Sequence, residues 1–227
     1  MVVAIFGLLV TQDRSPLDSL DQSGKAGEDW ADDHATLIQF LRLVEAAFAT
    51  IGMIIWAGLV AAILLSRRRV RAATFTVLVM VATSLTTTAL KIWLARGRPA
   101  WQDHVDLLSS KSFPSGHASS IAALVGVLLV LVWGLVRNRA VRWPATVFLL
   151  ILWFVVCLDR VLLGRHFPSD VVAGSLLGVA VVLIGCAVLD PVSERRASDQ
   201  FIASGSSPAG ARHKARQGFR DAKDRRP

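Results

Sequence analysis

Three short stretches of polar residues carry the side chains best suited to chemistry. The first contains two cations seven residues apart, Lys91 and Arg98, followed by Pro99. At about 3.6 residues per turn, this spacing brings both cations to one face of a helix, which Pro99 would end. Lysine and arginine on one face can hold a phosphate group, although two cations that merely reach the water at a membrane surface would show the same spacing.

The second stretch runs from Pro114 to His117 and precedes a long apolar run. Pro114 or Ser115 is typical of a helix start, and free backbone N–H groups at a helix start bind anions. Gly116 allows the backbone to come close to a phosphate. We therefore expect His117 in the first helical turn beside a bound anion, although a simple helix cap followed by a surface histidine fits the same residues.

The third stretch contains Arg160, His166, Pro168 and Asp170. Pro168 is typical of a first helical residue, which would put Asp170 in the first turn and His166 just before it. The carboxylate could then reach the imidazole, fix its tautomer and leave the other ring nitrogen free as a base or nucleophile. The alternative is a helix-capping acid near a surface histidine.

The elements that position these stretches are membrane-spanning helices. Hydrophobic residues make up 53% of the 227 residues, and the mean hydropathy is +0.52. They fall in segments close to the about 20 residues that cross a bilayer. These segments are 46–66, 72–95, 117–136, 143–163 and 169–189. The predicted fold class is an all-α transmembrane bundle of five full spans, with a partial or truncated first span before them.

The charged loops predict the orientation of the bundle. The formal net charge of +8 comes from basic clusters in the loops between spans, at 67–71 and 137–142, and after the last span, at 195–226. Basic loops of this kind stay on the cytoplasmic side. Alternation of the spans then puts all three chemistry-bearing stretches on the extracytoplasmic face. Because the basic residues follow the membrane topology, we expect membrane lipids and no nucleic acid as partners.

The ends of the chain have a different composition from the spans. Residues 1–45 predict a partial span followed by an external acidic loop, within which Leu37, Phe40, Leu41 and Val44 recur at the spacing of a short interfacial helix. Residues 46–190 form the predicted catalytic domain. Residues 191–227 predict a flexible basic cytoplasmic tail.

Other candidate sites are weaker. Asp32, Asp33 and His34 could hold a metal ion, but three adjacent side chains cannot easily face one ion. His104 falls in the predicted outer loop, and His213 falls in the basic tail without a partner. We expect no metal at any of these positions.

The three stretches together resemble the type 2 phosphatidic acid phosphatase (PAP2) family, which is related to the vanadium haloperoxidases. The family's motifs K-x6-RP, P-S-G-H and S-R-x5-H-x3-D match Lys91 to Pro99, Pro114 to His117 and Arg160 to Asp170 in the same order. Asp159 stands where the family has serine. An acid facing the phosphate would repel it, so we expect Asp159 to point away or to pair with a nearby arginine.

The resemblance implies a mechanism. His166 would attack phosphorus and form phosphohistidine, Asp170 would orient it, and His117 would protonate the leaving oxygen. The phosphoryl oxygens would be held by Lys91, Arg98, Ser115, Gly116 and Arg160, so that no metal or other cofactor is needed. Two histidines that start in opposite protonation states predict a bell-shaped pH–rate profile.

The expected function is hydrolysis of a lipid phosphate or diphosphate. A polyprenyl diphosphate such as undecaprenyl diphosphate is the favoured substrate, and phosphatidic acid and phosphatidylglycerol phosphate are the alternatives. The five predicted spans argue against a soluble haloperoxidase. The intact set of His117, His166 and Asp170 argues against a non-catalytic membrane protein of the same fold.

Overall fold

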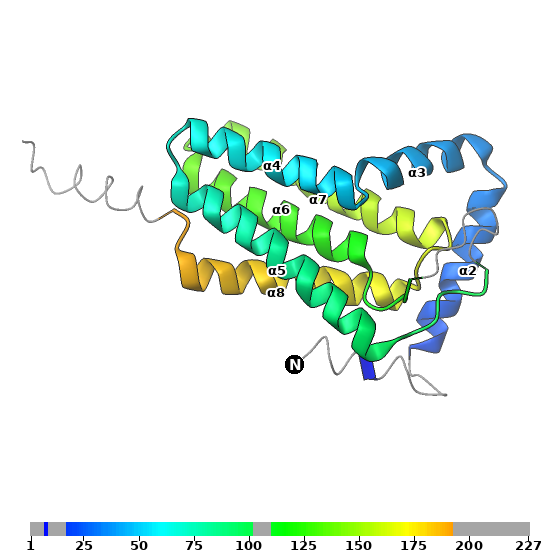
Figure 1. The fold of residues 1–227 in the computed structure, drawn as a ribbon. Helices are drawn as coiled ribbons and strands as arrows, with labels where there is room; N and C mark the ends of the chain where they lie inside the picture. The colour runs from blue at the N-terminus through cyan, green and yellow to red at the C-terminus, as the bar shows by residue number, and fades with distance from the viewer. Residues whose placement is uncertain (1–6, 9–16, 102–109, 193–227) are drawn as a thin grey trace, which may run out of the picture. The chain divides into compact units, whose positions relative to one another are not determined.

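The computed structural model describes residues 7–8, 17–101 and 110–192, and the regular elements within these ranges are helices (Figure 1). The labelled helices are α2 (Asp18–Asp32), α3 (Ala35–Ala47), α4 (Thr50–Ser66), α5 (Val70–Leu94), α6 (Gly116–Leu135), α7 (Arg139–Leu162) and α8 (Pro168–Leu189). The predicted all-α class is confirmed. The predicted partial first span, apart from Gly7 and Leu8, His104 and the basic tail lie outside the described residues.

Four helices, α5 to α8, are long and apolar enough to cross a membrane. Their bounds agree with the predicted segments to within a few residues. Large apolar side chains on their outer faces are exposed, among them Phe148 and Phe154 on α7 and Leu183 and Val188 on α8. A soluble protein rarely exposes apolar side chains over so wide an area, whereas a bilayer would cover them.

The first predicted span, 46–66, is not a single straight helix. The chain breaks between Ala47 and Thr50, and α3 and α4 meet at a bend of 57°. Ala49 is extended at this break, and the indole N–H of Trp56 donates to the free Ala47 carbonyl at 3.2 Å. The fifth span therefore exists only if α3 and α4 are counted together as one bent span. The hydropathy of the segment could not indicate this bend, because both sides of the break are apolar.

The acidic N-terminal segment is more helical than its sequence suggested. The short helix expected near Leu37 to Val44 is present as α3. An additional helix, α2, precedes it and packs against α7 and α8. The predicted loop therefore contains two helices, which form a layer at one end of the bundle (Figure 1).

Helix α6 is the centre of the bundle and contacts α4, α5, α7 and α8. Its approach to α8 is very close: a Cβ atom at Gly174 would lie 2.5 Å from the Ser115 carbonyl oxygen. Small residues at such crossings let helix backbones meet. A backbone hydrogen bond of 3.0 Å from Ser115 N to Asp170 O joins the starts of the two helices. This contact brings the second and third polar stretches together.

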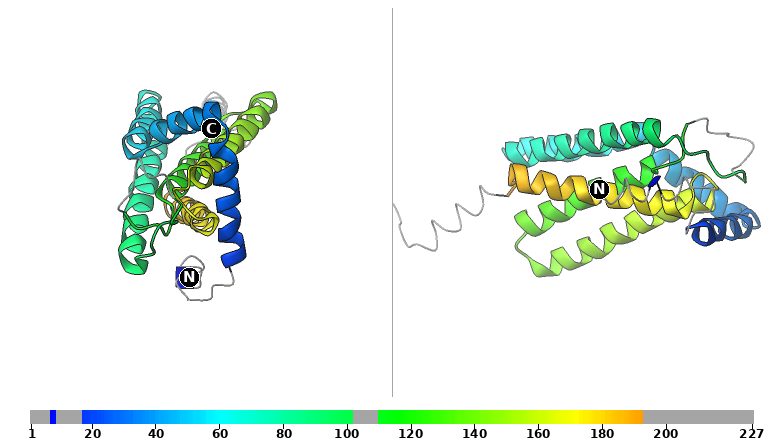
Figure 2. Two further views of the ribbon diagram at one scale, coloured as in Figure 1. Left: turned by 90° about the vertical axis from the view of Figure 1, so that its right-hand side faces the viewer. Right: turned by 90° about the horizontal axis from the view of Figure 1, so that it is seen from below.

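The polar stretches and the arginine loops lie at opposite ends of the bundle. The α5–α6 and α7–α8 connections share the end that α2 and α3 cover, whereas the α4–α5 and α6–α7 connections share the other end (Figure 1). Seen from below, α4 and α5 run together along one flank, with α7 on the opposite flank (Figure 2). The alternation predicted from the spans is confirmed for these four connections.

Candidate active site

The two connections at the covered end bring most of the predicted site residues around one cavity of about 740 Å³. Six predicted residues line it: Lys91, Arg98, Gly116, His117, Arg160 and His166. The other two do not line it: Asp170 lies 3.5 Å from His166 Nδ1, and Ser115 is the N-cap of α6. Residues from three motifs, up to 75 positions apart in the sequence, therefore share one site.

The first motif is not arranged as its spacing predicted. We expected Lys91 and Arg98 on one helix face, but α5 ends at Leu94, and Ala95 adopts the left-handed conformation. Arg98 precedes a proline, which disfavours the helical conformation at that position. Its guanidinium donates to Ser110 O at 2.7 Å and to the Arg165 carbonyl. The two cations still line the same cavity, because the chain folds back after the helix ends.

His166 is held with its ring nitrogens in different environments. Nδ1 lies 3.5 Å from Asp170 Oδ2 and 3.4 Å from Ser112 Oγ, and Nε2 lies 3.5 Å from Arg98 Nη1. A guanidinium can only donate, so its neighbour Nε2 must be the unprotonated nitrogen. The proton then sits on Nδ1, facing the carboxylate. In this tautomer the lone pair of Nε2 is available on the cavity side, and the contact between Asp170 and Nδ1 is the one that the motif spacing predicted.

Asp170 is fully buried and has more partners than the sequence indicated. Oδ2 accepts from Phe167 N at 3.1 Å and from the Ser112 hydroxyl. Oδ1 accepts from Arg96 Nη1 at 2.6 Å. Carboxylates that receive several hydrogen bonds stay ionised and fixed. Ser112 was not predicted as a site residue; its position two residues before Pro114 is the only sequence signal that could have indicated it.

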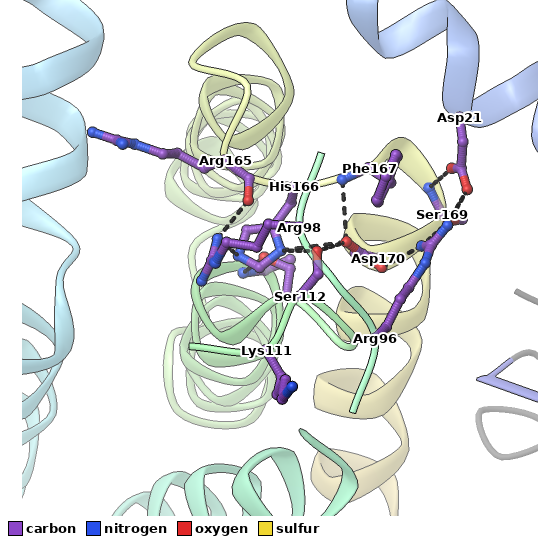
Figure 3. A network of polar contacts seen from close by, with 12 residues as sticks. Asp21, Arg96, Arg98, Lys111, Ser112, Arg165, His166, Phe167, Ser169 and Asp170 are labelled. Atoms are coloured by element: carbon purple, nitrogen blue, oxygen red, sulfur yellow. Dashed lines mark hydrogen bonds and ion pairs between the residues drawn. The ribbon is translucent and has the colours of Figure 1, made fainter. Parts of the chain in front are cut away.

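Arg96 is the most important residue that the sequence analysis missed (Figure 3). Its guanidinium joins Asp170 to Asp21 of α2, with Nη2 donating to Asp21 Oδ2 at 2.6 Å. It also lies 4.1 Å from the centre of the Phe167 ring. Asp21 in turn accepts from Ser169 N at 3.0 Å. The N-terminal helix is thereby connected through one arginine to the carboxylate that orients His166.

Replacing Arg96 by lysine is expected to lower kcat about tenfold while KM changes little. Lysine keeps the charge but lacks the planar fork that reaches both carboxylates, so Asp170 and His166 would lose their fixed positions. Steady-state hydrolysis of a lipid phosphate measures both constants. Arg139→Lys, an exposed position at the opposite end of the bundle, is the matched control. An increase in KM alone would mean that Arg96 contacts substrate instead.

Asp159 pairs with an arginine, as expected. Its Oδ2 accepts from Arg160 Nε at 2.7 Å and also from Nη2. Arg160 Nη1 donates to Glu45 of α3 at 2.8 Å, and Glu45 also lies 3.3 Å from Arg165 Nε. These bonds use three of the five N–H groups of Arg160, which leaves one on each terminal nitrogen for a phosphate. Asp159 does not line the cavity, so it would not repel the substrate directly.

The second motif forms the predicted helix start. Ser115 is the N-cap of α6, and its hydroxyl accepts from Ala118 N at 3.4 Å. This serine is fully buried and does not line the cavity, so its hydroxyl caps the helix and does not face the cavity. A Cβ at Gly116 would meet only Lys91 Cε at 3.9 Å, so the space beside this backbone is open. Within the described ranges, buried His117 Nε2 has no hydrogen-bond partner.

The pKa of His166 is lowered to about 4. Burial is the main cause, because it disfavours the charged imidazolium. The positive charges of Arg98 and Lys91 act in the same direction, and Asp170 opposes them. His166 is therefore neutral at physiological pH, the state in which an imidazole nitrogen can act as a base or nucleophile.

Modification of His166 by diethyl pyrocarbonate, which attacks neutral imidazole, tests this protonation state. The modification rate is expected to stay near its maximum as the pH is lowered and to reach half of the maximum only at about pH 4. An ordinary histidine loses half of its reactivity near pH 6.5, which N-acetylhistidine would show as a reference. Mass spectrometry of peptides identifies the modified residue. A midpoint near that of the reference would contradict the lowered pKa.

Asp32, Asp33 and His34 do not come together as a metal site. They lie at the end of α2 and the turn into α3, where the His34 ring packs on Trp30 with centroids 4.7 Å apart. No group of three or more His, Cys, Asp or Glu side chains suited to a metal ion occurs among the residues described.

Comparisons with known proteins agree with the geometry. A family model described as the PAP2 superfamily matches residues 72–191, which is more than half of the chain. Decaprenylphosphoryl-5-phosphoribose phosphatase from Mycobacterium tuberculosis is 40% identical over 83 residues, covering 37% of this chain and 40% of that protein. Undecaprenyl-diphosphatase BcrC from Bacillus subtilis is 38% identical over 74 residues, covering 33% and 32%. The chain thus matches less than half the length of these curated relatives.

Two solved structures share the fold. The PAP2-type phosphatidylglycerolphosphate phosphatase from Bacillus subtilis superposes with a TM-score of 0.70, covering 82% of this chain and 91% of that one at 21% identity. LpxE from Aquifex aeolicus gives a TM-score of 0.54, covering 68% and 87% at 20% identity. At about 20% sequence identity, the likeness to these two structures shows the fold alone.

Proposed function

The chain belongs to the PAP2 superfamily of membrane phosphatases, and from this membership we propose that it removes phosphate from a polyprenyl-type lipid phosphate or diphosphate through a phosphohistidine intermediate. The observation that carries the proposal is the cavity itself. One end holds His117 and His166 among three cations, and the rest runs between α4 and α5. Along α5 the lining extends from Lys91 to Val77, about 21 Å at 1.5 Å per residue.

The walls away from the histidines are suited to a hydrocarbon chain. On α4 the lining residues beyond Thr50 are Met53, Ile54, Ala57 and Gly58. A Cβ at Gly58 would meet nothing within 4 Å, so this wall is open. A cationic end joined to an apolar channel is complementary to a phosphate on a lipid. A soluble sugar phosphate would leave most of the channel uncovered.

In the first step, His166 Nε2 forms a bond to phosphorus as the bond from phosphorus to the leaving oxygen breaks. His117 donates a proton to that oxygen. Lys91, Arg98 and Arg160 neutralise the phosphoryl oxygens, whose charge is greatest in the transition state. The proton on His166 Nδ1 faces Asp170, which stabilises the positive charge that the ring gains.

In the second step, water attacks the phosphohistidine and the P–N bond breaks. His117, now neutral, accepts the proton from this water. The products are inorganic phosphate and the two histidines in their starting states. These side chains supply the acid, the nucleophile and the charge stabilisation, so we propose that the reaction requires no metal ion.

We propose that the site faces the extracytoplasmic side of the membrane. The support is the position of the arginine loops at 67–69 and 137–138, at the bundle end opposite the histidines. Basic loops favour the cytoplasmic side. A cysteine introduced at exposed Lys111, beside the site, would react with a membrane-impermeant maleimide in intact cells if this orientation holds.

The choice of a polyprenyl carrier is supported by two relatives whose names specify polyprenyl substrates. The test is phosphate release by the purified protein in EDTA, with polyprenyl diphosphate, polyprenyl phosphate, phosphatidic acid and phosphatidylglycerol phosphate compared at equal surface concentration. We expect the polyprenyl substrates to have the highest kcat/KM. Preference for a glycerolipid would overturn the substrate class, and loss of activity in EDTA would overturn the metal-free mechanism.

A further inference from the structure

Besides Thr87, whose hydroxyl is hydrogen-bonded to Ser119, three hydroxyl side chains line the cavity between its cationic end and its apolar end. They are Ser84 and Thr88 on α5 and Ser120 on α6, and we refer to them as the hydroxyl band. From Lys91, the rise of an α-helix puts Thr88 about 4.5 Å and Ser84 about 10.5 Å deeper along α5. Ser120 follows His117 by three residues, which is the spacing of neighbours on one helix face.

Three other hydroxyls of α5 already have hydrogen-bond partners. Thr76 and Thr83 donate to carbonyls of their own helix at 2.9 and 2.8 Å, and Thr87 is hydrogen-bonded to Ser119 at 2.8 Å. In contrast, the three side chains of the band have no hydrogen-bond partner in residues 7–8, 17–101 and 110–192. Inside a membrane an unsatisfied hydroxyl is unfavourable, so a partner within the cavity would stabilise it.

In phosphoryl transfer, the part of the substrate attached to the leaving oxygen would lie beside the hydroxyl band. The leaving oxygen departs on the side of phosphorus opposite His166 and takes its proton from His117. The next cavity-lining residue along α6 is Ser120, and Thr88 and Ser84 lie one to two turns below Lys91 on α5. The residues that line α5 beyond Ser84 are all apolar: Val81, Met80 and Val77.

We propose that the hydroxyl band binds an oxygen-rich linker between the scissile phosphate and the hydrocarbon chain of the substrate. This inference rests on the proposed lipid phosphatase function and specifies its substrate further. The linker is a second phosphate or a phosphorylated sugar unit, and both offer oxygen atoms to the same hydroxyls. With a lipid monophosphate, the hydrocarbon chain would instead lie against the hydroxyl band, and the three hydroxyls would have no hydrogen-bond partner.

The test compares three polyprenyl substrates of equal chain length. One is the monophosphate, one is the diphosphate, and one carries a sugar phosphate as linker. We expect the purified protein to favour the two linker substrates. In the Ser84→Ala/Thr88→Val/Ser120→Ala variant, the ratio of kcat/KM for linker substrate over monophosphate is expected to fall about tenfold or more, since one lost hydrogen bond corresponds to about fivefold. The linker substrate with the larger loss is the one that the band recognises.

Thr86→Val is the matched control, because Thr86 belongs to the same stretch of α5 and is exposed like Ser84 and Thr88, but it does not line the cavity. Its substrate ratio should equal that of the unmodified protein. The single substitutions, each expected to lower the ratio, keep the test decisive if the triple variant does not fold.

Two outcomes separate this inference from the proposed function. Hydrolysis of all three lipids with a ratio that the band variants do not change would overturn the linker inference alone. The absence of phosphate release from every lipid phosphate would overturn the proposed function, and the linker inference with it.

Discussion

Phosphate release is expected to fall by about four orders of magnitude or more when His166 is replaced by alanine, because the reaction loses its nucleophile. The structural reason is the asymmetry of the ring. Nδ1 faces Asp170 and Ser112, and Nε2 faces Arg98 at the cavity. No other imidazole has a carboxylate at this distance in the part of the chain that the structure describes.

A second readout distinguishes loss of the nucleophile from a general loss of structure. Quenching in alkaline detergent during turnover of a diphosphate that is radiolabelled on its terminal phosphate should trap a phosphoprotein, and acid should remove its label, as for a phosphoramidate. His166→Ala should trap none. His34→Ala, at an exposed histidine between α2 and α3, should keep both activity and label. Label retained in His166→Ala would show that another residue is the nucleophile.

Replacing His117 by glutamine is expected to slow hydrolysis of an alkyl lipid phosphate by about two to four orders of magnitude, the usual contribution of a general acid. His117 lines the cavity in the first turn of α6, beside the place where the leaving oxygen would stand. The loss should be much smaller with a nitrophenyl phosphate, because its leaving group departs without a proton.

The comparison between the two substrates is what assigns the role. The ratio of activities on nitrophenyl and alkyl phosphates should rise in His117→Gln, whereas His166→Ala should lose both. An equal loss on both substrates in His117→Gln would rule out proton donation and leave His117 with a binding role. Activity at saturating substrate concentration measures the effect on the chemical step.

The fold was predictable wherever one physical signal dominates. The bounds of helices α5 to α8 agree with the prediction to within a few residues, because a long apolar run indicates a segment that crosses a bilayer. The break at Ala49 was not predictable, since apolarity continues across it. The prediction that Arg98 shares a helix face with Lys91 was wrong for a similar reason: the helical spacing continues to Arg98, but the helix ends at Leu94, before the left-handed Ala95.

The site was predictable where its residues lie close together in sequence. The spacing of His166 and Asp170 across one helix start indicated their contact, and the structure has it. Ser112, Arg96, Asp21 and Glu45 were missed because their roles arise from contacts between segments distant along the chain. A single sequence contains no signal for such pairings, and Asp21 and Glu45 look like ordinary surface acids.

The bond from Arg96 to Asp21 means that the candidate site extends beyond the segment that the family model matches. All the predicted site residues fall within 72–191, the segment shared with the family model, yet Asp21 and Glu45 come from helices before it. A transplant of residues 72–191 alone would lack Asp21 and Glu45, the carboxylates outside this segment that pair with Arg96 and Arg160. A substitution in α2 or α3 can therefore change the electrostatics around Asp170 and Arg160 without changing any residue of the three motifs.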